Sequence, residues 1–348
     1  MKNNLLSQFA VLEKVNKPLV IKNLKIPNLQ KNQLLVKIKY SYICGTQLNE
    51  IFGAKGPDKY VPHTLGHEAS GNIMQVGPGI KNFKIGERVV LSWIKKKGSS
   101  SVNPFYLDKK NKKINSGLVS TFSNFTVVSK DRVYKIPANL PMDIAALFGC
   151  ALPTGFGIVL NYLKKISKND YVGIYGVGGV GIMSLIALKS LGIKNIYAID
   201  KNKKNLNIAK KFGCKFTLTL ENFEKKILNK FINKKNIKYN FEMSGNKMMM
   251  EAAIRNLSNS GSMIFAGNTK KGDFIKLNPY DLIFGKKIFG FSGNNVSLEK
   301  NLKNYIKIIK KINFKKISNI FSIYRFKNIN NAILDFKKGT VLRPLIKF

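Results

Sequence analysis

The sequence predicts an α/β protein with two domains, a mostly antiparallel β region followed by a parallel sheet built of βαβ units. A chain of 348 residues is longer than a single hydrophobic core usually supports. Short strand-like runs separated by Gly, Pro and Asn turns fill the first part of the chain. From about Thr154, strand-like runs alternate with amphipathic helical patterns, which is typical of a parallel sheet.

The first region contains four predicted strands. Residues 34–43 alternate apolar and polar positions, as in a strand with one face in water. The other three are short and are bounded by turns such as Gly77-Pro78-Gly79: Gly71–Val76, Arg88–Trp93 and Phe125–Val128. The Lys- and Ser-rich stretch Lys95–Asn115 is predicted to be a surface loop.

The second region contains four apolar runs that predict parallel strands: Tyr171–Tyr175, Asn195–Ile199, Tyr239–Met243 and Ser262–Ala266. A Lys-rich helix is predicted afterwards at Leu298–Ile312. The uncharged stretch Tyr171–Leu188 has 18 residues, the length of a membrane span. Its five glycines favour a strand, a tight turn and a buried helix instead, so no membrane association is expected.

The chain is strongly basic, with a formal net charge of +42. Such a charge is typical of proteins that bind nucleic acids. Only 5 of the 60 basic residues are Arg, however, whereas sites for phosphate favour the planar guanidinium group. Lys is enriched along the whole chain together with Asn and Ile, which indicates a compositional bias. No nucleic-acid partner is therefore predicted.

Three cysteines, Cys44, Cys150 and Cys214, form no disulfide framework, and their number is odd. Free thiols of this kind are typical of reducing compartments. The cytoplasm is therefore the predicted location.

A glycine motif after the first parallel strand predicts a dinucleotide-binding turn. Gly176 permits the tight turn, Gly178 lets the backbone approach a pyrophosphate, and Gly181 allows close packing of helix on strand. Gly179 and Val180 complete the motif, and the following helix offers unpaired N–H groups to the phosphates. The alternative is a glycine-rich turn with a structural role only.

Asp200 ends the next strand, 19 residues after Gly181. A carboxylate at this place accepts hydrogen bonds from the ribose hydroxyls of adenosine. Its charge repels a 2′-phosphate, so NAD is predicted over NADP. Lys201, Lys203 and Lys204 follow at once and would weaken that preference. The alternative is that Asp200 is an ordinary surface acid.

Cys44, His67 and Cys150 are candidate zinc ligands at intervals of 23 and 83 residues. Two thiolates and an imidazole suit Zn²⁺, and three protein ligands leave the fourth position for water or substrate, as catalytic zinc requires. The wide spacing is unlike the C-x-x-C pairs of a structural site. Taken singly, each of these residues is more often a buried core residue than a ligand.

The motifs around these residues resemble those of the medium-chain zinc-dependent alcohol dehydrogenase family. The resemblance runs in order through nearly the whole chain: Cys44-Gly-Thr46, Gly66-His67-Glu68, Val76-Gly-Pro-Gly79, Gly86-Glu-Arg88, Thr154-Gly155, the glycine motif, Glu242-Met-Ser-Gly245, Gly261-Ser-Met-Ile-Phe-Ala-Gly267 and Arg343-Pro344.

The resemblance implies a GroES-like, mostly antiparallel β catalytic domain of residues 1–152 and 293–348. It implies a Rossmann domain, with a doubly wound parallel sheet, of residues 153–292. Cys44, His67 and Cys150 would bind one catalytic zinc ion, and Glu68 would lie beside the metal or act as an occasional ligand. A homodimer or homotetramer is also implied.

The resemblance further implies roles outside the ligand set. Thr46 would take the substrate proton, and Thr154 would touch the nicotinamide. Arg343 would contact the pyrophosphate. The backbone around Ala266 and Asn268 would hold the carboxamide of the cofactor.

Three positions depart from the family pattern. Gln47 stands where many relatives have an acidic residue hydrogen-bonded to the ligand histidine, so zinc is expected to be held more loosely or to be more electrophilic. Asn49 replaces the distal histidine of some relatives' proton relay and cannot titrate, so the proton leaves by ribose, water or another route. His63 lies between Pro62 and Gly66, which predicts a loop and a structural or substrate-facing role.

One segment of many relatives is missing. The lobe with four cysteines that binds a structural zinc has no counterpart, because Lys95–Asn115 contains no cysteine. A single zinc per chain is therefore predicted.

The predicted function is a zinc-dependent oxidoreductase that transfers hydride between NAD and a primary or secondary alcohol, including polyols and sugar derivatives. One alternative is a zinc-free reductase of the same superfamily that reduces enones or quinones with NADPH, against which the three candidate ligands argue. The other is a non-catalytic basic binding protein, which a steep salt dependence of DNA binding would favour.

Overall fold

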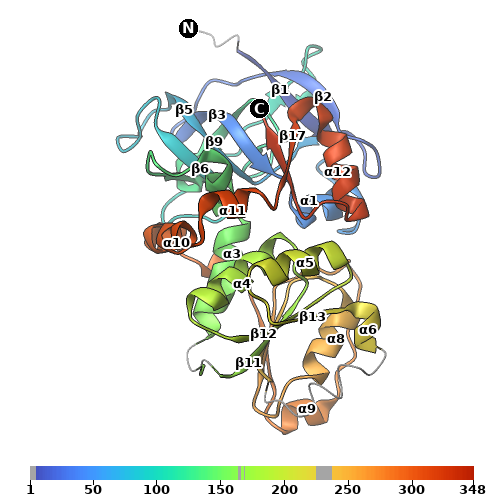
Figure 1. The fold of residues 1–348 in the computed structure, drawn as a ribbon. Helices are drawn as coiled ribbons and strands as arrows, with labels where there is room; N and C mark the ends of the chain where they lie inside the picture. The colour runs from blue at the N-terminus through green and yellow to red at the C-terminus, as the bar shows by residue number, and fades with distance from the viewer. Residues whose placement is uncertain (1–4, 164–165, 168, 225–236) are drawn as a thin grey trace. The chain divides into compact units, whose positions relative to one another are not determined.

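The computed structural model describes residues 5–163, 166–167, 169–224 and 237–348, which form two compact units (Figure 1). Unit 1 comprises Met1–Cys150 and Ser297–Phe348, and unit 2 comprises Ala151–Val296. The divisions thus fall after residues 150 and 296, where the sequence predicted 152 and 292. The first division falls earlier because helix α3 (Ala151–Tyr162) is continuous and packs along α4 (Gly179–Ser190) of unit 2.

Unit 1 is built on two sheets whose named strand pairs, within the described residues, are antiparallel except for β17 with β18. In spatial order the first sheet comprises β4 (His63–Thr64), β1 (Leu6–Leu12), β2 (Val20–Lys25), β7 (Tyr106–Leu107) and β8 (Lys113–Ile114). The second comprises β10 (Val133–Lys135), β6 (Arg88–Ser92), β5 (Glu68–Val76), β3 (Gln33–Tyr42), β18 (Pro344–Lys347) and β17 (Ser322–Arg325), and β9 (Phe125–Ser129) pairs with β3. The antiparallel character predicted for this region is confirmed.

Strand β3 is more deeply buried than predicted. Leu34, Val36 and Ile38 belong to one core cluster, while Leu35 packs into another with Val127. Both faces of the first half are therefore covered, and the prediction of one wet face was wrong there. The reason is that a separate core cluster packs on each face of the strand, one with Ile73 and Val89 and the other with Phe9 and Tyr106.

The stretch Lys95–Asn115 is not only a surface loop. It contains the two short strands β7 and β8, and it buries Tyr106 and Ile114 completely. The Tyr106 ring packs on Phe9, with 4.4 Å between the ring centroids, and its hydroxyl accepts a hydrogen bond from the Val127 N–H. The polar composition of the stretch concealed these two core residues.

The helices of unit 1 are α1 (Gly45–Ile51), α2 (Met142–Ala146), α10 (Leu298–Ile312), α11 (Phe314–Ser318) and α12 (Ile329–Lys338), with 3₁₀ turns at Lys130–Arg132, Leu147–Gly149 and Phe326–Asn328. Helix α10 has the predicted bounds. Helix α12 ends at Gly339, whose φ of 71° provides the left-handed cap. The chain then enters β18, which pairs with β3 and so brings the C-terminus into the second sheet of unit 1 (Figure 1).

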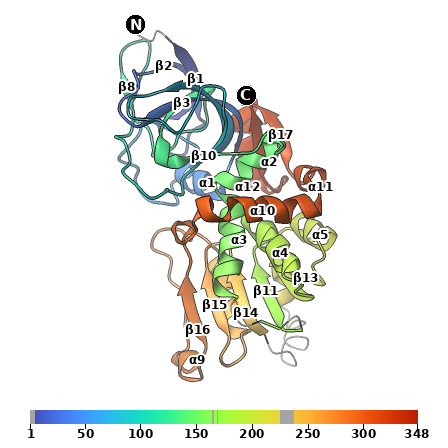
Figure 2. The ribbon, with the colours of Figure 1, turned by 90° about the vertical axis from the view of Figure 1, so that its left-hand side faces the viewer.

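Unit 2 is a six-stranded parallel sheet. In spatial order it comprises β13 (Phe216–Thr219), β12 (Asn195–Asp200), β11 (Tyr171–Tyr175), β14 (Ile237–Glu242), β15 (Ser262–Phe265) and β16 (Lys287–Gly290). Figure 2 shows β11, β14, β15 and β16 side by side. The helices within its described residues are α3, α4, α5 (Lys203–Lys211), α6 (Leu220–Glu224), α8 (Lys247–Arg255) and α9 (Pro279–Ile283), with a 3₁₀ turn at Gly293–Asn295.

The strand order of unit 2 reverses between β11 and β14, as in a doubly wound Rossmann sheet. The four predicted strands are confirmed, whereas the edge strands β13 and β16 were missed. Their sequences, FTLT and KIFG, are too short to show a periodic pattern, and both strands are partly exposed. The stretch Tyr171–Leu188 forms a strand, a turn and a helix, as predicted.

No single helix in the described parts of the chain is long and apolar enough to cross a membrane, although the bent pair Met142–Gly149 and Ala151–Tyr162 passes the same test of length and composition.

We predict that Tyr106→Ala lowers the free energy of unfolding by about 3–5 kcal/mol, because it opens a cavity in the core. The neighbouring Phe105→Ala serves as control, since that ring is 48% exposed and its loss should change stability by less than about 0.5 kcal/mol. Denaturant unfolding measures both. Equal effects of the two substitutions would contradict the packing of this stretch.

Candidate metal and dinucleotide sites

Four side chains of unit 1 converge on one point, where Glu68 and Cys150 are buried and Cys44 and His67 are partly exposed. The ligand atoms of Cys44, His67, Glu68 and Cys150 all lie within 4.8 Å of one another. The sequence predicted the first, second and fourth as ligands, and Glu68 as their neighbour. Two thiols, an imidazole and a carboxylate are the donor types that Zn²⁺ takes in proteins.

Each ligand residue lies at the end of a regular element. Cys44 is the N-cap residue of α1, His67 directly precedes β5, and Cys150 follows the 3₁₀ turn after α2. The turn before Cys150 is tightly enclosed, because a Cβ atom on Gly149 would lie 2.5 Å from both the Glu68 Cβ and the Leu91 carbonyl oxygen. Ser92 Oγ donates to the Gly149 carbonyl at 2.7 Å and holds this turn against β6.

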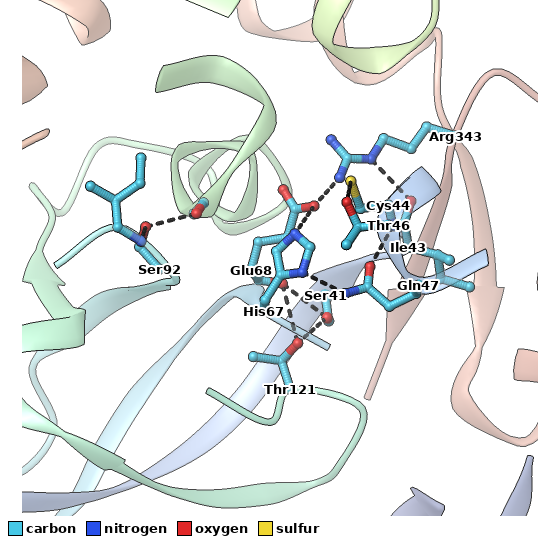
Figure 3. Close-up of polar contacts among 12 residues, drawn as sticks. Ser41, Ile43, Cys44, Thr46, Gln47, His67, Glu68, Ser92, Thr121 and Arg343 are labelled. Atoms are coloured by element: carbon cyan, nitrogen blue, oxygen red, sulfur yellow. Dashed lines mark hydrogen bonds and ion pairs between the residues drawn. The ribbon is translucent and has the colours of Figure 1, made fainter. Parts of the chain in front are cut away.

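The imidazole of His67 is oriented by a single amide (Figure 3). Gln47 Nε2 lies 2.5 Å from His67 Nδ1, and Gln47 Oε1 accepts the Cys44 backbone N–H at 2.9 Å. His67 Nε2 is buried and has no hydrogen-bond partner among the described residues, and it lies 3.9 Å from Glu68 Oε1. A buried ring nitrogen of this kind, beside thiols and a carboxylate, fits a cation as its partner.

Cys44 lies in surroundings that favour the thiolate. The hydrogen bond from Cys150 holds the pKa of the Cys44 thiol well below its usual range. Burial acts in the opposite direction, while the positive charge of Arg343 lowers the pKa further. The thiolate is the form that binds metals.

Glu68 is completely buried, and the structure pairs it with Arg343 (Figure 3). Arg343 Nη2 donates to Glu68 Oε1, and Arg343 Nε donates to the Ile43 carbonyl at 3.1 Å. The guanidinium also lies 5.3 Å from the centre of the Tyr42 ring, and its Nη1 has no partner among the described residues. Sequence reasoning missed this ion pair because 275 residues separate its members.

The backbone of Glu68 is held by two hydroxyl groups, those of Ser41 and Thr121, which sequence reasoning also missed. Ser41 Oγ donates to the Glu68 carbonyl at 2.9 Å and lies 2.7 Å from Thr121 Oγ1. Both residues are fully buried. Serine and threonine are too common in the sequence for this contact to be recognised there.

Thr46 lies in the first turn of α1, beside the cluster. Its hydroxyl is hydrogen-bonded to Cys44, with 3.8 Å between Sγ and Oγ1. His63, which the sequence placed in a loop, forms the short strand β4 with Thr64 and pairs with β1. Its Nε2 lies 2.9 Å from Asp58 Oδ2, so it is not part of the cluster.

In unit 2 the glycine motif forms the turn after β11, at the switch point of the sheet. Gly176 has a φ of 91°, and a Cβ atom there would lie 2.7 Å from the Ser244 backbone nitrogen. A Cβ atom on Gly181 would lie 2.1 Å from the Gly176 carbonyl oxygen. A Cβ atom on Gly178 would meet no heavy atom within 4 Å, so this residue faces open space and a ligand can approach the backbone there.

Helix α4 begins at this turn with Gly179 and Val180. Its 12 residues leave the usual unpaired N–H groups at the first turn, where a phosphate group binds favourably. The parallel strands end at the same edge, which is where ligands of doubly wound sheets bind.

Asp200 is 7% exposed and ties the two neighbouring strand ends together. Its Oδ2 accepts the Val177 N–H and its Oδ1 the Asn202 N–H, each at 2.8 Å. Burial raises the pKa of this carboxyl group, while the two backbone hydrogen bonds and Asn205 act against the rise. Asp200 is therefore a structural support of the glycine turn.

Three more predicted cofactor residues lie in unit 2. Thr154 Oγ1, in α3, is buried without a hydrogen-bond partner in the described chain. The Ala266 N–H donates to the Glu242 carbonyl at 2.8 Å, which fixes the turn after β15. Asn268 follows, and its carbonyl oxygen would lie 2.2 Å from a Cβ atom on Gly245.

Two family models match consecutive parts of the chain. Residues 30–138 match the alcohol dehydrogenase GroES-like domain, and residues 179–311 match the zinc-binding dehydrogenase domain. The alcohol dehydrogenase class-3 of Pisum sativum is 29% identical over 335 residues, which cover 86% of this chain and 88% of that protein. The class-3 enzyme of Zea mays is 28% identical and covers 80% of both.

The chain belongs to the medium-chain dehydrogenase/reductase family. Solved structures agree in fold. An alcohol dehydrogenase zinc-binding domain protein from Burkholderia ambifaria has a TM-score of 0.89 at 20% identity and covers 99% of both chains. Benzyl alcohol dehydrogenase from Acinetobacter calcoaceticus has a TM-score of 0.87 at 23% identity, covering 99% of this chain and 100% of that chain.

Unit 1 of this dehydrogenase is thus the GroES-like domain, and unit 2 is the Rossmann domain. The fold class predicted from the sequence is therefore confirmed. The protein is an oxidoreductase.

The Rossmann domain of this dehydrogenase contains a buried acid that the sequence did not single out. Glu242 ends β14, beside the switch point, and is fully buried. Its Oε1 accepts N–H groups from Ser244 at 2.7 Å and Gly245 at 3.0 Å, while its Oε2 has no partner within the described residues. Burial raises the pKa of Glu242 to about 7, although these hydrogen bonds act in the opposite direction. The sequence could have indicated Glu242 by its place at the end of a predicted strand of the parallel sheet.

We predict that Glu242→Gln changes the pH dependence of stability. The carboxyl group releases its proton near pH 4.5 in the unfolded chain and near pH 7 in the folded chain. Between these values the folded state binds more protons, so the wild type loses up to about 3 kcal/mol as the pH rises from 4.5 to 7.

Glutamine cannot ionise, so this loss should be absent from the variant. Denaturant unfolding of both proteins at about pH 5, 6, 7 and 8 measures the difference. Parallel pH profiles would show that Glu242 does not titrate in this range.

Proposed function

We propose that this dehydrogenase is a zinc-dependent, nicotinamide-linked enzyme that interconverts alcohols and carbonyl compounds. The observation that carries the proposal is the convergence of Cys44, His67 and Cys150 from three distant stretches of the chain on one point. The family match and the alcohol dehydrogenase relatives support the reaction class.

Cys44, His67 and Cys150 would hold the ion. Glu68, already engaged by Arg343, would stay beside it as a neighbouring negative charge. When bound, zinc supplies a Lewis acid that acidifies a hydroxyl group or polarises a carbonyl group. The ligand set also argues against the alternative of a zinc-free reductase. A reaction without a metal ion does not require two thiols and an imidazole within 4.8 Å of one another.

The protein supplies the path of the proton. Thr46, next to the cluster, takes the proton of the substrate hydroxyl and passes it outward, because its own hydroxyl cannot hold a charge at neutral pH. Asn49 cannot titrate. Glu50 lies four residues after Thr46 and therefore on the same side of α1, so its carboxylate is the nearest titratable group along this helix.

The Rossmann domain would hold the dinucleotide. The turn Gly176–Gly181 would face the pyrophosphate, Thr154 would contact the nicotinamide, and the backbone at Ala266 and Asn268 would bind the carboxamide. Arg343, whose Nη1 has no partner among the described residues, would contribute to the pyrophosphate site. When bound, the nicotinamide ring accepts or donates the hydride.

NAD is the proposed cofactor. The Asp200 carboxylate lies at the end of β12, where it would accept the ribose hydroxyls and repel a 2′-phosphate. Lys201, Lys203 and Lys204 follow it in the sequence and would reduce the repulsion.

The proposed substrate is rich in hydroxyl groups, a polyol or a sugar derivative. A cavity of about 560 Å³ lies in unit 1. Polar and charged side chains form much of its lining, which comprises Glu50, Lys55, Pro57, Asp58, Lys59, Tyr60, His63, Asn103, Ser116, Gly117 and Leu118. Its charged side chains balance in number, Glu50 and Asp58 against Lys55 and Lys59. Lys55 lies 3.5 Å from Glu50 and His63 lies 2.9 Å from Asp58, so no single charge dominates. The exposed ring of Tyr60 adds an apolar surface. Such a lining suits a neutral ligand with many hydrogen-bonding groups.

A homodimer or homotetramer in the cytoplasm remains the expectation from the sequence, as does the lack of a nucleic-acid partner.

We predict that Cys150→Ser lowers zinc content and turnover while NADH binding stays close to that of the wild type. Oxygen replaces a preferred sulfur ligand, whereas the dinucleotide residues are untouched. The control is Cys214→Ser, since Cys214 lies in the Rossmann domain with its thiol on the Ile196 and Phe216 carbonyls.

Metal analysis, NADH fluorescence titration and an NAD-reduction screen over alcohols, polyols and sugar derivatives measure these effects. Full wild-type turnover after complete removal of zinc would overturn the zinc dependence. Equal losses in both cysteine variants would point to general destabilisation instead.

We predict that Asp200→Asn lowers the preference for NAD over NADP by about 10-fold or more, because it removes the repulsion of the 2′-phosphate but keeps an acceptor for the Val177 N–H. The ratio of kcat/KM for the two cofactors measures the preference. Asp273→Asn, at an exposed position of the same domain, is the charge control. An unchanged ratio in Asp200→Asn would exclude the ribose role.

A further inference from the structure

The amide of Gln47 lies between the backbone N–H of Cys44 and the imidazole of His67. Its side chain is 2% exposed, so water does not compete for it. Oε1 accepts the backbone N–H of Cys44 at 2.9 Å, and Nε2 lies 2.5 Å from Nδ1 of His67 (Figure 3). One amide therefore holds both the first turn of α1 and the imidazole.

This arrangement selects one tautomer of His67. An amide nitrogen only donates, so Nδ1 accepts and the proton of the neutral ring is on Nε2. Nε2 is the nitrogen that faces the cluster, and it has no hydrogen-bond partner in the described chain. A metal ion on Nε2 requires the lone pair of this atom, so the proton must move to Nδ1.

Once the proton is on Nδ1, two N–H groups face one amide. The Cys44 N–H and the His67 Nδ1–H both need an acceptor, and Gln47 has a single acceptor oxygen. Turning the amide over satisfies His67 and leaves the Cys44 N–H opposite an NH₂ group. Whichever way the amide is turned, one hydrogen bond is lost in a buried place.

A carboxylate at this position would not face this conflict. Its two oxygens accept from both N–H groups at once, and its charge supports the Nδ1–H tautomer. The side chains of Glu and Gln have the same length and shape, so the substitution changes the hydrogen-bonding capacity and the charge without changing the packing.

We propose that Gln47 is a positioning residue that opposes metal uptake, because it stabilises the His67 tautomer that cannot bind a metal ion. Binding of zinc is thereby coupled to the loss of one hydrogen bond at the start of α1, the helix that carries Thr46. The ion is held more weakly than with an acid at this position. The inference rests on the proposed function only in requiring that Cys44, His67 and Cys150 bind zinc.

The test compares wild type with Gln47→Glu. The dissociation constant for Zn²⁺ is measured by competition of the metal-free proteins with a chromophoric chelator, and we expect it to fall by about 10- to 100-fold in the variant. Asn49→Asp adds the same charge to α1 two residues away, on another side of the helix. It should change the constant by no more than about 5-fold.

Nitrogen NMR of the imidazole rings provides a readout independent of activity and of metal affinity. The chain has two histidines, and a His63→Gln variant assigns the signals. Metal-free wild type should carry the His67 proton on Nε2, and Gln47→Glu should carry it on Nδ1.

A proton on Nδ1 in the metal-free wild type, or a Gln47→Glu constant within the range of the Asn49→Asp control, would overturn the role of Gln47 while leaving the zinc site intact. Failure of both wild type and Gln47→Glu to bind Zn²⁺ would overturn the proposed metal site, and the role of Gln47 with it.

Discussion

The buried contact between Glu68 and Arg343 joins the parts of unit 1 on which the site depends. Arg343 also donates to the carbonyl of Ile43, the residue before Cys44, while Glu68 directly follows His67. One guanidinium group therefore ties together the chain segments that carry two of the candidate ligands. Both side chains are almost completely enclosed, and a buried charge that loses its partner is strongly destabilising. The C-terminal segment is thus a structural part of the first unit, although most of the chain separates it from Glu68.

The same cluster explains why a cation suits this place. Two thiols, an imidazole nitrogen and a carboxylate are brought together at one point, and the imidazole nitrogen is buried without a hydrogen bond among the described residues. Arg343 compensates the charge of Glu68, but a Cys44 thiolate adds a second negative charge. Buried polar groups are stable only when they are paired. A divalent ion on the sulfur and nitrogen atoms would give the imidazole nitrogen a partner and would compensate the charge of the thiolate. Gln47 works against this solution, because its one oxygen serves either the helix start or the metal-binding tautomer.

The Rossmann unit concentrates its polar groups in a comparable way at one edge of a parallel sheet. Asp200 and Glu242 end the two strands that flank β11, and each accepts backbone N–H groups of a neighbouring turn. The turns themselves interlock, since Gly176 leaves no room for a side chain next to Ser244. These buried acids hold the loops of the switch point in place, and the glycine at 178 keeps the surface between them open.

The sequence by itself determined the local features of this protein. The turn at Gly176–Gly181, helix α10 and the strands next to them follow from side-chain periodicity and from backbone conformations that only glycine adopts readily, which act over a few residues. It also supplied the ligand types, and the order of the motifs indicated the family. Only the tertiary structure decided which distant groups meet: Glu68 with Arg343, Gln47 with both Cys44 and His67, and Tyr106 with the core beneath a polar loop. Such contacts depend on the packing of whole sheets and on chain closure over many residues, and no local pattern encodes them.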